Sequence, residues 1–511
     1  MKNDLDTVLR SLGSTALGSV RLKPFSDEPA PPLCSGGETS ACELKKGDFE
    51  FYRDSLLKGL NFPYREASAY PPAIISGTSR VGVIDTQLDV DHCAFAALKA
   101  AGRLIRIGPA AKLATVTPPI APCEWMLPRA NVDISTSHGT HVAGIIAGRY
   151  KDLVWGLNPY VTLFTGHVPL TGTADAEEVK LGDLSELLAS MLTESARIGG
   201  LDVVNFSFYY ARPSAASSDA SGRAQRAFGD PVLQTIKTLG KNTLFVVAAG
   251  NDHEQFSAIC DSRPSCFDLP NVISVGALND SSPTAPLLSL SGARGSNFGR
   301  RVHVATPGHN VFSSISGNYF GVLSGTSQAA PQVAAVASLL RAANSYLTPG
   351  EVKERLITCS TSIPISSNPS PDEDIEAGGV VFGGRVDAAC TLEKLGWLEL
   401  KSAPTPILVK EVRANEDLVF TPADRTSPVY FNPRTIRGIR ANVEDNTFTI
   451  YHRRAGDDPD AALSREERVE PLAGQEQKLS LTIVGPGGSS RNFLYPIKDI
   501  VRFVPPLRKQ W

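Results

Sequence analysis

The feature that most constrains the fold is an alternation, beginning at Arg80, of short apolar segments with longer segments of helical spacing. The short segments are rich in β-branched residues and do not alternate strictly between apolar and polar positions. Strands of this kind are typical of a sheet that is covered on both faces. They occupy residues 80–85, 161–168, 202–208, 243–250, 271–278 and 301–308.

Helical patterns lie between these segments, at residues 184–199, 231–240 and 327–344. Strands and helices in alternation predict parallel βαβ units, and right-handed crossovers place their helices on both faces of the sheet. The sequence therefore predicts an α/β fold with a doubly wound, mostly parallel sheet. In such sheets the chemistry collects at the carboxyl ends of the strands.

The chain has 511 residues, which is too long for one ordinary hydrophobic core. Residues 24–42 are rich in Pro, Ser, Gly and acidic residues and are typical of a loop or linker, and a short helix is expected near residues 48–60. Beyond residue 397 the pattern becomes strand-like, with turn signals such as residues 485–488. We therefore predict an amino-terminal extension (1–75), the α/β domain (76–396) and a small β-rich domain (397–511).

The composition restricts the partners. A formal net charge of −3 argues against a general nucleic-acid-binding protein, which would usually be basic. Asp4, Asp6 and Arg10 interrupt any apolar run of the kind that a secretory signal needs. No other segment is apolar for long enough to cross a bilayer. These observations predict a cytoplasmic protein without a membrane partner.

Eight cysteines are present, and none forms a CxxC pair. A zinc ribbon or a thioredoxin-type site is therefore not expected. Two pairs, Cys34 with Cys42 and Cys260 with Cys266, are close enough in the sequence to be bridged. In the absence of an export signal, we interpret all eight as reduced, mostly buried thiols.

Three separated segments carry the side chains that a serine nucleophile needs. The strand 80–85 delivers Asp85 to its carboxyl end, where a buried carboxylate can hold an imidazole in one tautomer. His138 lies where loop gives way to helix, among small residues that permit close packing. Ser327 begins an apolar helix, in whose first turn Pro331 is tolerated.

The position of Ser327 also favours stabilisation of negative charge. The first N–H groups of a helix have no intrahelical partner, and the helix dipole is positive at that end. Asn251 follows the strand 243–250 and supplies a carboxamide as a second donor. Donors fixed in advance around a developing oxyanion are commonly the largest catalytic contribution.

These segments resemble the subtilisin (subtilase) family. The blocks VGVIDT, HGTHVAG, AAGND and SGTSQAAP appear in the family's order of Asp, His, Asn and Ser, which differs from the order in chymotrypsin-like enzymes and α/β-hydrolases. Further similar segments are NVISVGAL, SNFGRRVHVATPG and GGRVDAA. The resemblance implies a serine endopeptidase with Asp85, His138 and Ser327 as catalytic triad, Asn251 in the oxyanion hole, a polypeptide substrate and no cofactor.

The sequence departs from the family's pattern at several positions. Gln87 stands where the family usually has Gly, and Gln328 where it usually has Met after the nucleophile. Tyr209 replaces the Gly that ends the family's N-x-S-L-G segment, which borders the substrate cleft. By resemblance the substrate-binding residues are expected to be Ser207, Phe208, Tyr209, Ala248, Ala249 and Gly250. Their character suggests a hydrophobic side chain before the scissile bond.

Two other classes of function stay open. One is a pseudoprotease or partner-binding module with the subtilase fold, in which Tyr209 and the insertion at residues 118–129 cover the cleft. The other is a regulated protease whose amino-terminal or carboxy-terminal extension binds a protein partner. His92, His141 and His167 are interpreted as structural. Asp89, Asp91 and Asp133 lack the regular spacing of a calcium loop, so no metal is expected.

Overall fold

The structure is a computed structural model, and it describes most of the α/β part and parts of both extensions. The described residues are 19–23, 28–29, 46–64, 69–75, 79–108, 134–150, 153–154, 156–168, 178–211, 230–256, 260, 262–282, 285–290, 294–363, 384–403, 405–413, 418–422, 429–431, 433–442, 447–453, 465–471, 477–484 and 489–507.

A seven-stranded sheet forms the centre of the α/β part, in the order β14-β13-β11-β9-β3-β7-β4. All of its strand pairs are parallel. The strands are β3 (Arg80–Asp85), β4 (Leu104–Ile107), β7 (Thr162–His167), β9 (Val203–Phe206), β11 (Leu244–Ala248), β13 (Val272–Leu278) and β14 (Val304–Pro307). The predicted doubly wound, mostly parallel sheet is confirmed, and β4 is a strand that the sequence analysis missed.

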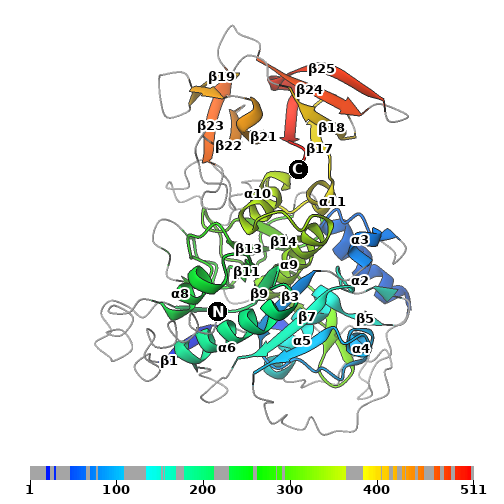
Figure 1. The fold of residues 1–511 in the computed structure, drawn as a ribbon, viewed down its shortest axis with the longest axis vertical. Helices are drawn as coiled ribbons and strands as arrows, with labels where there is room; N and C mark the ends of the chain where they lie inside the picture. The colour runs from blue at the N-terminus through cyan, green and yellow to red at the C-terminus, as the bar shows by residue number, and fades with distance from the viewer. Residues whose placement is uncertain are drawn as a thin grey trace.

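Helices cover both faces of this sheet (Figure 1). They are α2 (Lys46–Gly59), α3 (Pro72–Ile75), α4 (Ala96–Ala100), α5 (Ile134–Ala147), α6 (Leu181–Ser195), α8 (Pro231–Leu239), α9 (Thr326–Ala343), α10 (Pro349–Cys359) and α11 (Ala388–Leu392). On β9 and on β11, residues that are adjacent in the sequence enter different cores. Val203 and Val246 pack with α9, whereas Val204 and Phe245 pack with α6 and α8. This double burial explains why the strands are continuous apolar runs.

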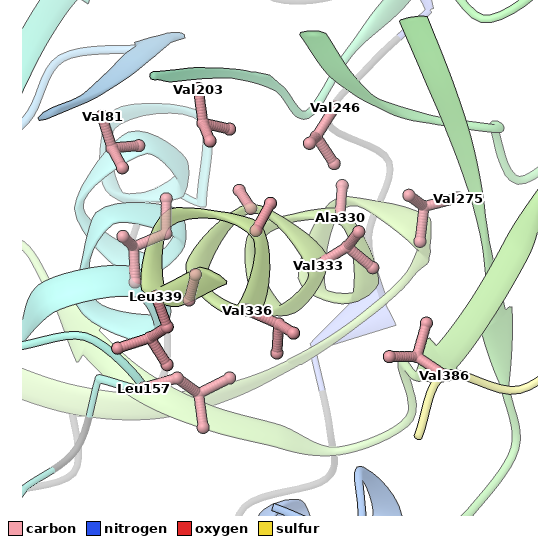
Figure 2. Packing of buried hydrophobic residues seen from close by; sticks show 14 of the residues in the cluster. Val81, Leu157, Val203, Val246, Val275, Ala330, Val333, Val336, Leu339 and Val386 are labelled. Carbon is pink, nitrogen blue, oxygen red and sulfur yellow. The ribbon is translucent and has the colours of Figure 1, made fainter. Parts of the chain in front are cut away.

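Helix α9 is buried nearly all round, from Thr326 to Leu340. Figure 2 shows it alongside a row of valines from four strands, with Val336 pointing away from that row. The row consists of Val81, Val203, Val246 and Val275. A helix that is apolar on every side needs a layer above and below it. The alanines of α9 permit the close approach of both layers.

A ten-stranded antiparallel sheet follows the α/β part, in the order β20-β19-β23-β22-β21-β26-β17-β18-β24-β25. It confirms the predicted β-rich region. Its strands are β17 (Gly396–Leu400), β18 (Ile407–Val412), β19 (Leu418–Pro422), β20 (Val429–Phe431), β21 (Ile436–Asn442), β22 (Thr447–His452), β23 (Arg465–Pro471), β24 (Lys478–Val484), β25 (Ser490–Pro496) and β26 (Ile500–Val504). Its apolar residues form a core separate from those of the parallel sheet.

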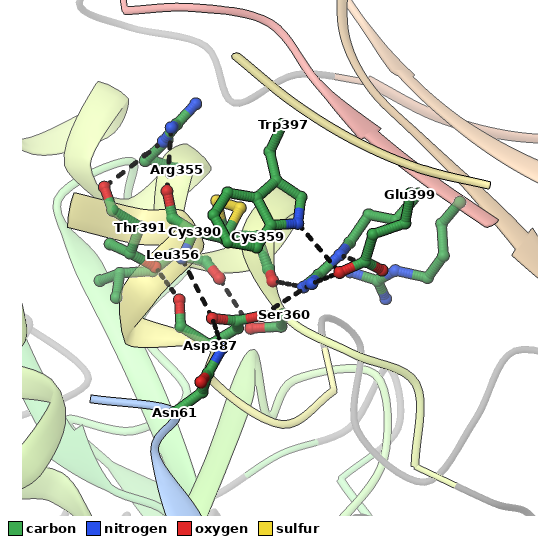
Figure 3. A network of polar contacts seen from close by, with 12 residues as sticks. Asn61, Arg355, Leu356, Cys359, Ser360, Asp387, Cys390, Thr391, Trp397 and Glu399 are labelled. Carbon is green, nitrogen blue, oxygen red and sulfur yellow. Dashed lines mark hydrogen bonds and ion pairs between the residues drawn. A yellow bond between two sulfur atoms is a disulfide. The ribbon is translucent and has the colours of Figure 1, made fainter. Parts of the chain in front are cut away.

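Buried arginines attach the ten-stranded sheet to α10 and α11 (Figure 3). The guanidinium group of Arg502, on β26, donates to the carboxylate of Asp387 over 2.7 Å and pairs with Glu399. Arg355, on α10, donates to the carbonyl oxygens of Cys390 and Pro505. Removing one partner of such a buried pair would leave a buried charge without compensation, which would lower the free energy of unfolding.

The cysteines correct an interpretation of the sequence. Cys260 is bonded to Cys266, and Cys359 to Cys390, and Cys93 is also in a disulfide. The interpretation as reduced thiols is therefore wrong for these five residues, whereas Cys34, Cys42 and Cys123 lie outside the described residues. Cys359 and Cys390 are 31 positions apart, and α10 and α11 bring their Cα atoms to 5.5 Å. Sequence spacing could not reveal that pair.

Within the described part of the chain, no helix has the length and apolar character needed to cross a bilayer.

A buried lysine makes the stability depend on pH. Burial lowers the pKa of Lys353, on α10, from 10.5 to about 7. Between these pH values the unfolded chain binds a proton that the folded chain does not, so the free energy of unfolding rises with pH there by up to about 1.4 kcal/mol per unit. Below pH 7 the lysine is protonated in both states, and the folded state bears the full free-energy cost of burying its charge.

We predict that Lys353→Met raises the free energy of unfolding at pH 7, and that its advantage over the wild type disappears as the pH approaches 10.5. Urea denaturation at several pH values measures this. Lys237→Met, at an exposed site on α8, is the matched control and should change neither the stability nor its pH dependence. Parallel curves for the wild type and Lys353→Met would contradict the prediction.

Candidate active site

A buried carboxylate and a buried imidazole meet at the carboxyl edge of the parallel sheet. Asp85 is the last residue of β3, and His138 lies near the start of α5. His138 Nδ1 is 2.6 Å from Asp85 Oδ1, and the two side chains are 0% and 1% exposed. The backbone N–H of Thr86 donates to the same carboxylate oxygen over 2.7 Å. This geometry fixes the ring orientation and favours a proton on Nδ1.

Thr86 holds helix α5 against the end of β3, a role that the sequence analysis did not assign. The N–H of Gly139 donates to Thr86 Oγ1 over 2.8 Å. A Cβ at Gly139 would lie 2.3 Å from the carbonyl oxygen of Thr86, so a side chain there would push the helix away. The small residue after His138 is therefore required for the contact with Asp85. The signal was available in the sequence as the Asp-Thr and His-Gly pairs.

Ser327 approaches the same edge from the start of α9. Its Oγ donates to the carbonyl oxygen of Ser207 over 2.9 Å, and Ser207 Oγ donates to the carbonyl oxygen of Ser327 over the same distance. Ile84 lies opposite Phe206 in the parallel pair of β3 and β9. Asp85 and Ser207 therefore follow neighbouring strand positions. The structure thus brings Ser327 to the edge where Asp85 and His138 are paired.

Asn251 is fixed by the first residue of α9. Thr326 donates to Asn251 Oδ1 from its backbone N–H over 2.9 Å and from its hydroxyl over 3.0 Å. Thr326 Oγ1 in turn accepts the N–H of Gly250 over 3.0 Å. Because both bonds go to the oxygen, the nitrogen of the carboxamide lies on the side away from Thr326. The sequence analysis quoted Thr326 only as part of a block and missed this positioning role.

The expected substrate-binding residues all lie at this edge and are all buried. Phe208 packs edge to face with Phe206, with ring centroids 5.5 Å apart, inside the core of the α6 face. Tyr209 lies beside Gly250, and its hydroxyl donates to the carboxylate of Asp252. Burial, with the hydrogen bond acting in the same direction, raises the pKa of Tyr209 above its ordinary value. Contact of these residues with a substrate stays a prediction.

Two of the three histidines that were interpreted as structural contact the backbone. His141 Nε2 lies 3.0 Å from the carbonyl oxygen of Val311, and burial lowers the pKa of His141 to about 3. His92 caps a short helix by accepting the N–H of Ala94 over 3.0 Å. Burial also lowers the pKa of His167. Neutral rings in these positions fit their interpretation as structural residues.

The acidic residues weighed for calcium have other partners. Asp89 accepts the backbone N–H groups of Asp91 and Gly317 over 3.2 and 2.9 Å. Asp91 pairs with Lys99, and Asp133 lies outside the described residues. Among the residues whose placement is described, no group of three or more His, Cys, Asp or Glu side chains could hold a metal ion.

Comparisons with known proteins identify the family. A model of the Subtilase family matches residues 77–378, more than half of the chain, and the chain belongs to this family. It is 29% identical over 229 residues to subtilisin amylosacchariticus of Bacillus subtilis subsp. amylosacchariticus, covering 44% of this chain and 51% of that one. It is 32% identical over 257 residues to an extracellular basic protease of Dichelobacter nodosus, covering 45% and 36%.

The chain thus spans about half or less of the length of these curated relatives. Among solved structures, the prenylagaramide maturation protease PagA aligns with a TM-score of 0.43 and 21% identity, covering 66% of this chain and 98% of that one.

We predict that Thr326→Val lowers the free energy of unfolding by about 1–3 kcal/mol, because the buried N–H of Gly250 then loses its acceptor and Asn251 loses a donor. Thr326→Ser keeps the hydroxyl and is the matched control. Urea denaturation of both variants measures the difference. Equal stabilities would mean that the hydroxyl does not hold the two segments together.

Proposed function

We propose that this chain is a serine endopeptidase that hydrolyses polypeptides through an acyl-enzyme on Ser327. Asp85 orients His138 and stabilises its charged form, His138 acts first as general base and then as general acid, and Asn251 helps to hold the oxyanion. The observation that carries the proposal is the buried contact of 2.6 Å between His138 Nδ1 and Asp85 Oδ1. A carboxylate without access to water stabilises the imidazolium that forms when His138 accepts a proton.

The reaction proceeds in two displacements. His138 removes the proton of the Ser327 hydroxyl, and the oxygen attacks the scissile carbonyl carbon. The tetrahedral intermediate collapses when His138 gives the proton to the leaving amine, and the peptide C–N bond breaks. Water then adds to the acyl-enzyme with the same proton transfers, which releases the new carboxylate and restores Ser327.

Two kinds of donor serve the oxyanion. The N–H of Ser327 is one of the first N–H groups of α9, which have no intrahelical acceptor. The carboxamide of Asn251 is oriented by its two bonds from Thr326. A donor that is already oriented needs no reorganisation as charge develops, which is why this arrangement favours the transition state over the bound substrate.

The segments expected to form the cleft are mostly apolar, so the proposal includes a hydrophobic residue before the scissile bond.

The cysteines bear on the cellular compartment in which the protein works. The paired cysteines favour an oxidising compartment, because disulfides persist there. The proposal therefore does not depend on a location in the cytoplasm.

We predict that Ser327→Ala abolishes hydrolysis of an internally quenched peptide blocked at both ends, and also abolishes labelling by a fluorophosphonate probe. Circular dichroism should show an unchanged fold, because only one hydroxyl is removed. Ser345→Ala, at an exposed position after α9, is the matched control and should keep both activities. A wild-type chain that neither cleaves nor labels would instead support a binding module with the subtilase fold.

We predict that Asn251→Ala lowers kcat by about 10²–10³ with little change in KM, the loss measured for one oxyanion donor in a subtilisin and adopted here as a scale. Steady-state kinetics measure the effect. Urea denaturation of the same variant separates it from a loss of folded protein. A reduction in kcat below tenfold would mean that the oxyanion is held by other groups.

A further inference from the structure

The ten-stranded sheet ends in an exposed edge strand, β25. This strand is last in the strand order, next to β24, and Figure 1 shows it at the outer side of the sheet. The two strands pair over seven positions, from Lys478 opposite Pro496 to Val484 opposite Ser490, without a shift of register. Within the described residues, β24 is the sole strand partner of β25. About half of the backbone N–H and C=O groups of β25 therefore point away from the sheet.

The two edges of this sheet differ in length. The strand at the other edge, β20, has three residues, whereas β25 has seven and spans about 23 Å. Proteins commonly make an edge unable to pair by shortening it, by a bulge or by an internal proline. In β25 the pairing has no bulge, and the proline is the last residue, Pro496. The backbone of β25 is therefore open to pairing with a further strand.

Apolar side chains extend the core of the sheet to this edge. Phe493 and Tyr495 lie opposite Leu481 and Leu479, which are buried in that core, and their rings are 6.0 Å apart. Phe493 is nevertheless 42% exposed. Leu494, on the opposite face of β25, is 58% exposed. The edge therefore presents uncovered apolar surface on both faces, and a further strand with apolar side chains would bury it.

The charge at this edge is positive. The charged residues of β24 and β25 are Lys478 and Arg491, and neither strand has a carboxylate. Lys410, on β18, donates to Ser490 Oγ over 3.3 Å and adds a cation near Arg491. Glu411 lies on β18, two strands in from the edge. An acidic partner complements this edge, whereas a second copy of the chain would bring the same positive charges to it.

We propose that β25 binds an extended, acidic segment of a partner polypeptide as an eleventh strand of the sheet. All strand pairs of this sheet are antiparallel, so the segment runs antiparallel to β25. Its residues opposite Tyr495, Leu494 and Phe493 are apolar, and its residue opposite Arg491 is acidic. Read from its amino end, the segment has three apolar residues, one polar residue and one acidic residue. This inference does not depend on the proposed function.

The test uses the peptide Thr-Val-Ile-Val-Thr-Glu-Thr, blocked at both ends and carrying a neutral fluorescent dye, and a second peptide with Lys in place of Glu. Fluorescence anisotropy measures their binding to the full chain with Ser327→Ala, which leaves the peptides uncleaved. The acidic peptide should bind about fivefold more tightly, because the basic one replaces a cross-strand pair of opposite charges by a pair of like charges. Adding Arg491→Glu should reverse this order. Lys237→Glu, with the same change of charge at an exposed site on α8, is the matched control and should leave it unchanged.

Three outcomes would overturn the inference. The first is the absence of saturable binding, or equal binding of the two peptides. The second is binding that Arg491→Glu and Phe493→Ser both leave unchanged, which would place the peptide elsewhere on the chain. The third is dimerisation of the chain without peptide, seen by sedimentation and abolished by Phe493→Ser, which would assign the edge to a second copy. None of these measurements needs peptidase activity, so a failure of the proposed function would be seen separately.

Discussion

The burial of helix α9 on all sides is the constraint on which the rest of the α/β structure depends. Its first fifteen residues, from Thr326 to Leu340, are all buried, including Gln328 and Gln332. Such a helix is stable only between two layers, here the valines of the parallel sheet and the two segments that carry Leu157 and Val386 (Figure 2). With the helix so confined, the position of Ser327 follows from the core packing and does not depend on a surface loop.

The chemistry of the edge rests on hydrogen bonds between segments that the core has already placed. Thr86 ties the end of β3 to α5, and Thr326 ties the end of β11 to α9. In both cases a threonine hydroxyl lies next to the residue with the proposed chemical role. The ends of β3 and β11 are therefore tied to their helices by neutral side chains, which add no charge to the candidate active site.

The sequence predicted the strands and helices whose apolar residues form a regular pattern. The six apolar segments and the four helices that it identified all appear, with ends displaced by up to four residues, and residues 85, 138, 251 and 327 meet one edge. It could not predict β4, which is short and has a charged residue at its centre, Arg106. It also missed the pairing of β1 (Ser19–Lys23) and β2 (Glu28–Pro29), because a strand of two to five residues acquires its register from distant edges. The disulfide of Cys359 escaped for the same reason.

The amino-terminal extension is held against the α/β part by contacts at the start of α11. Ala388 and Ala389, at the start of α11, donate to the carbonyl oxygens of Leu60 and Asn61 over 2.8 and 3.0 Å. Asn61 Nδ2 also donates to Asp387, the carboxylate that Arg502 neutralises (Figure 3). The end of α2, the start of α11 and β26 therefore share one buried cluster of hydrogen bonds, in which Asp387 balances the charge of Arg502.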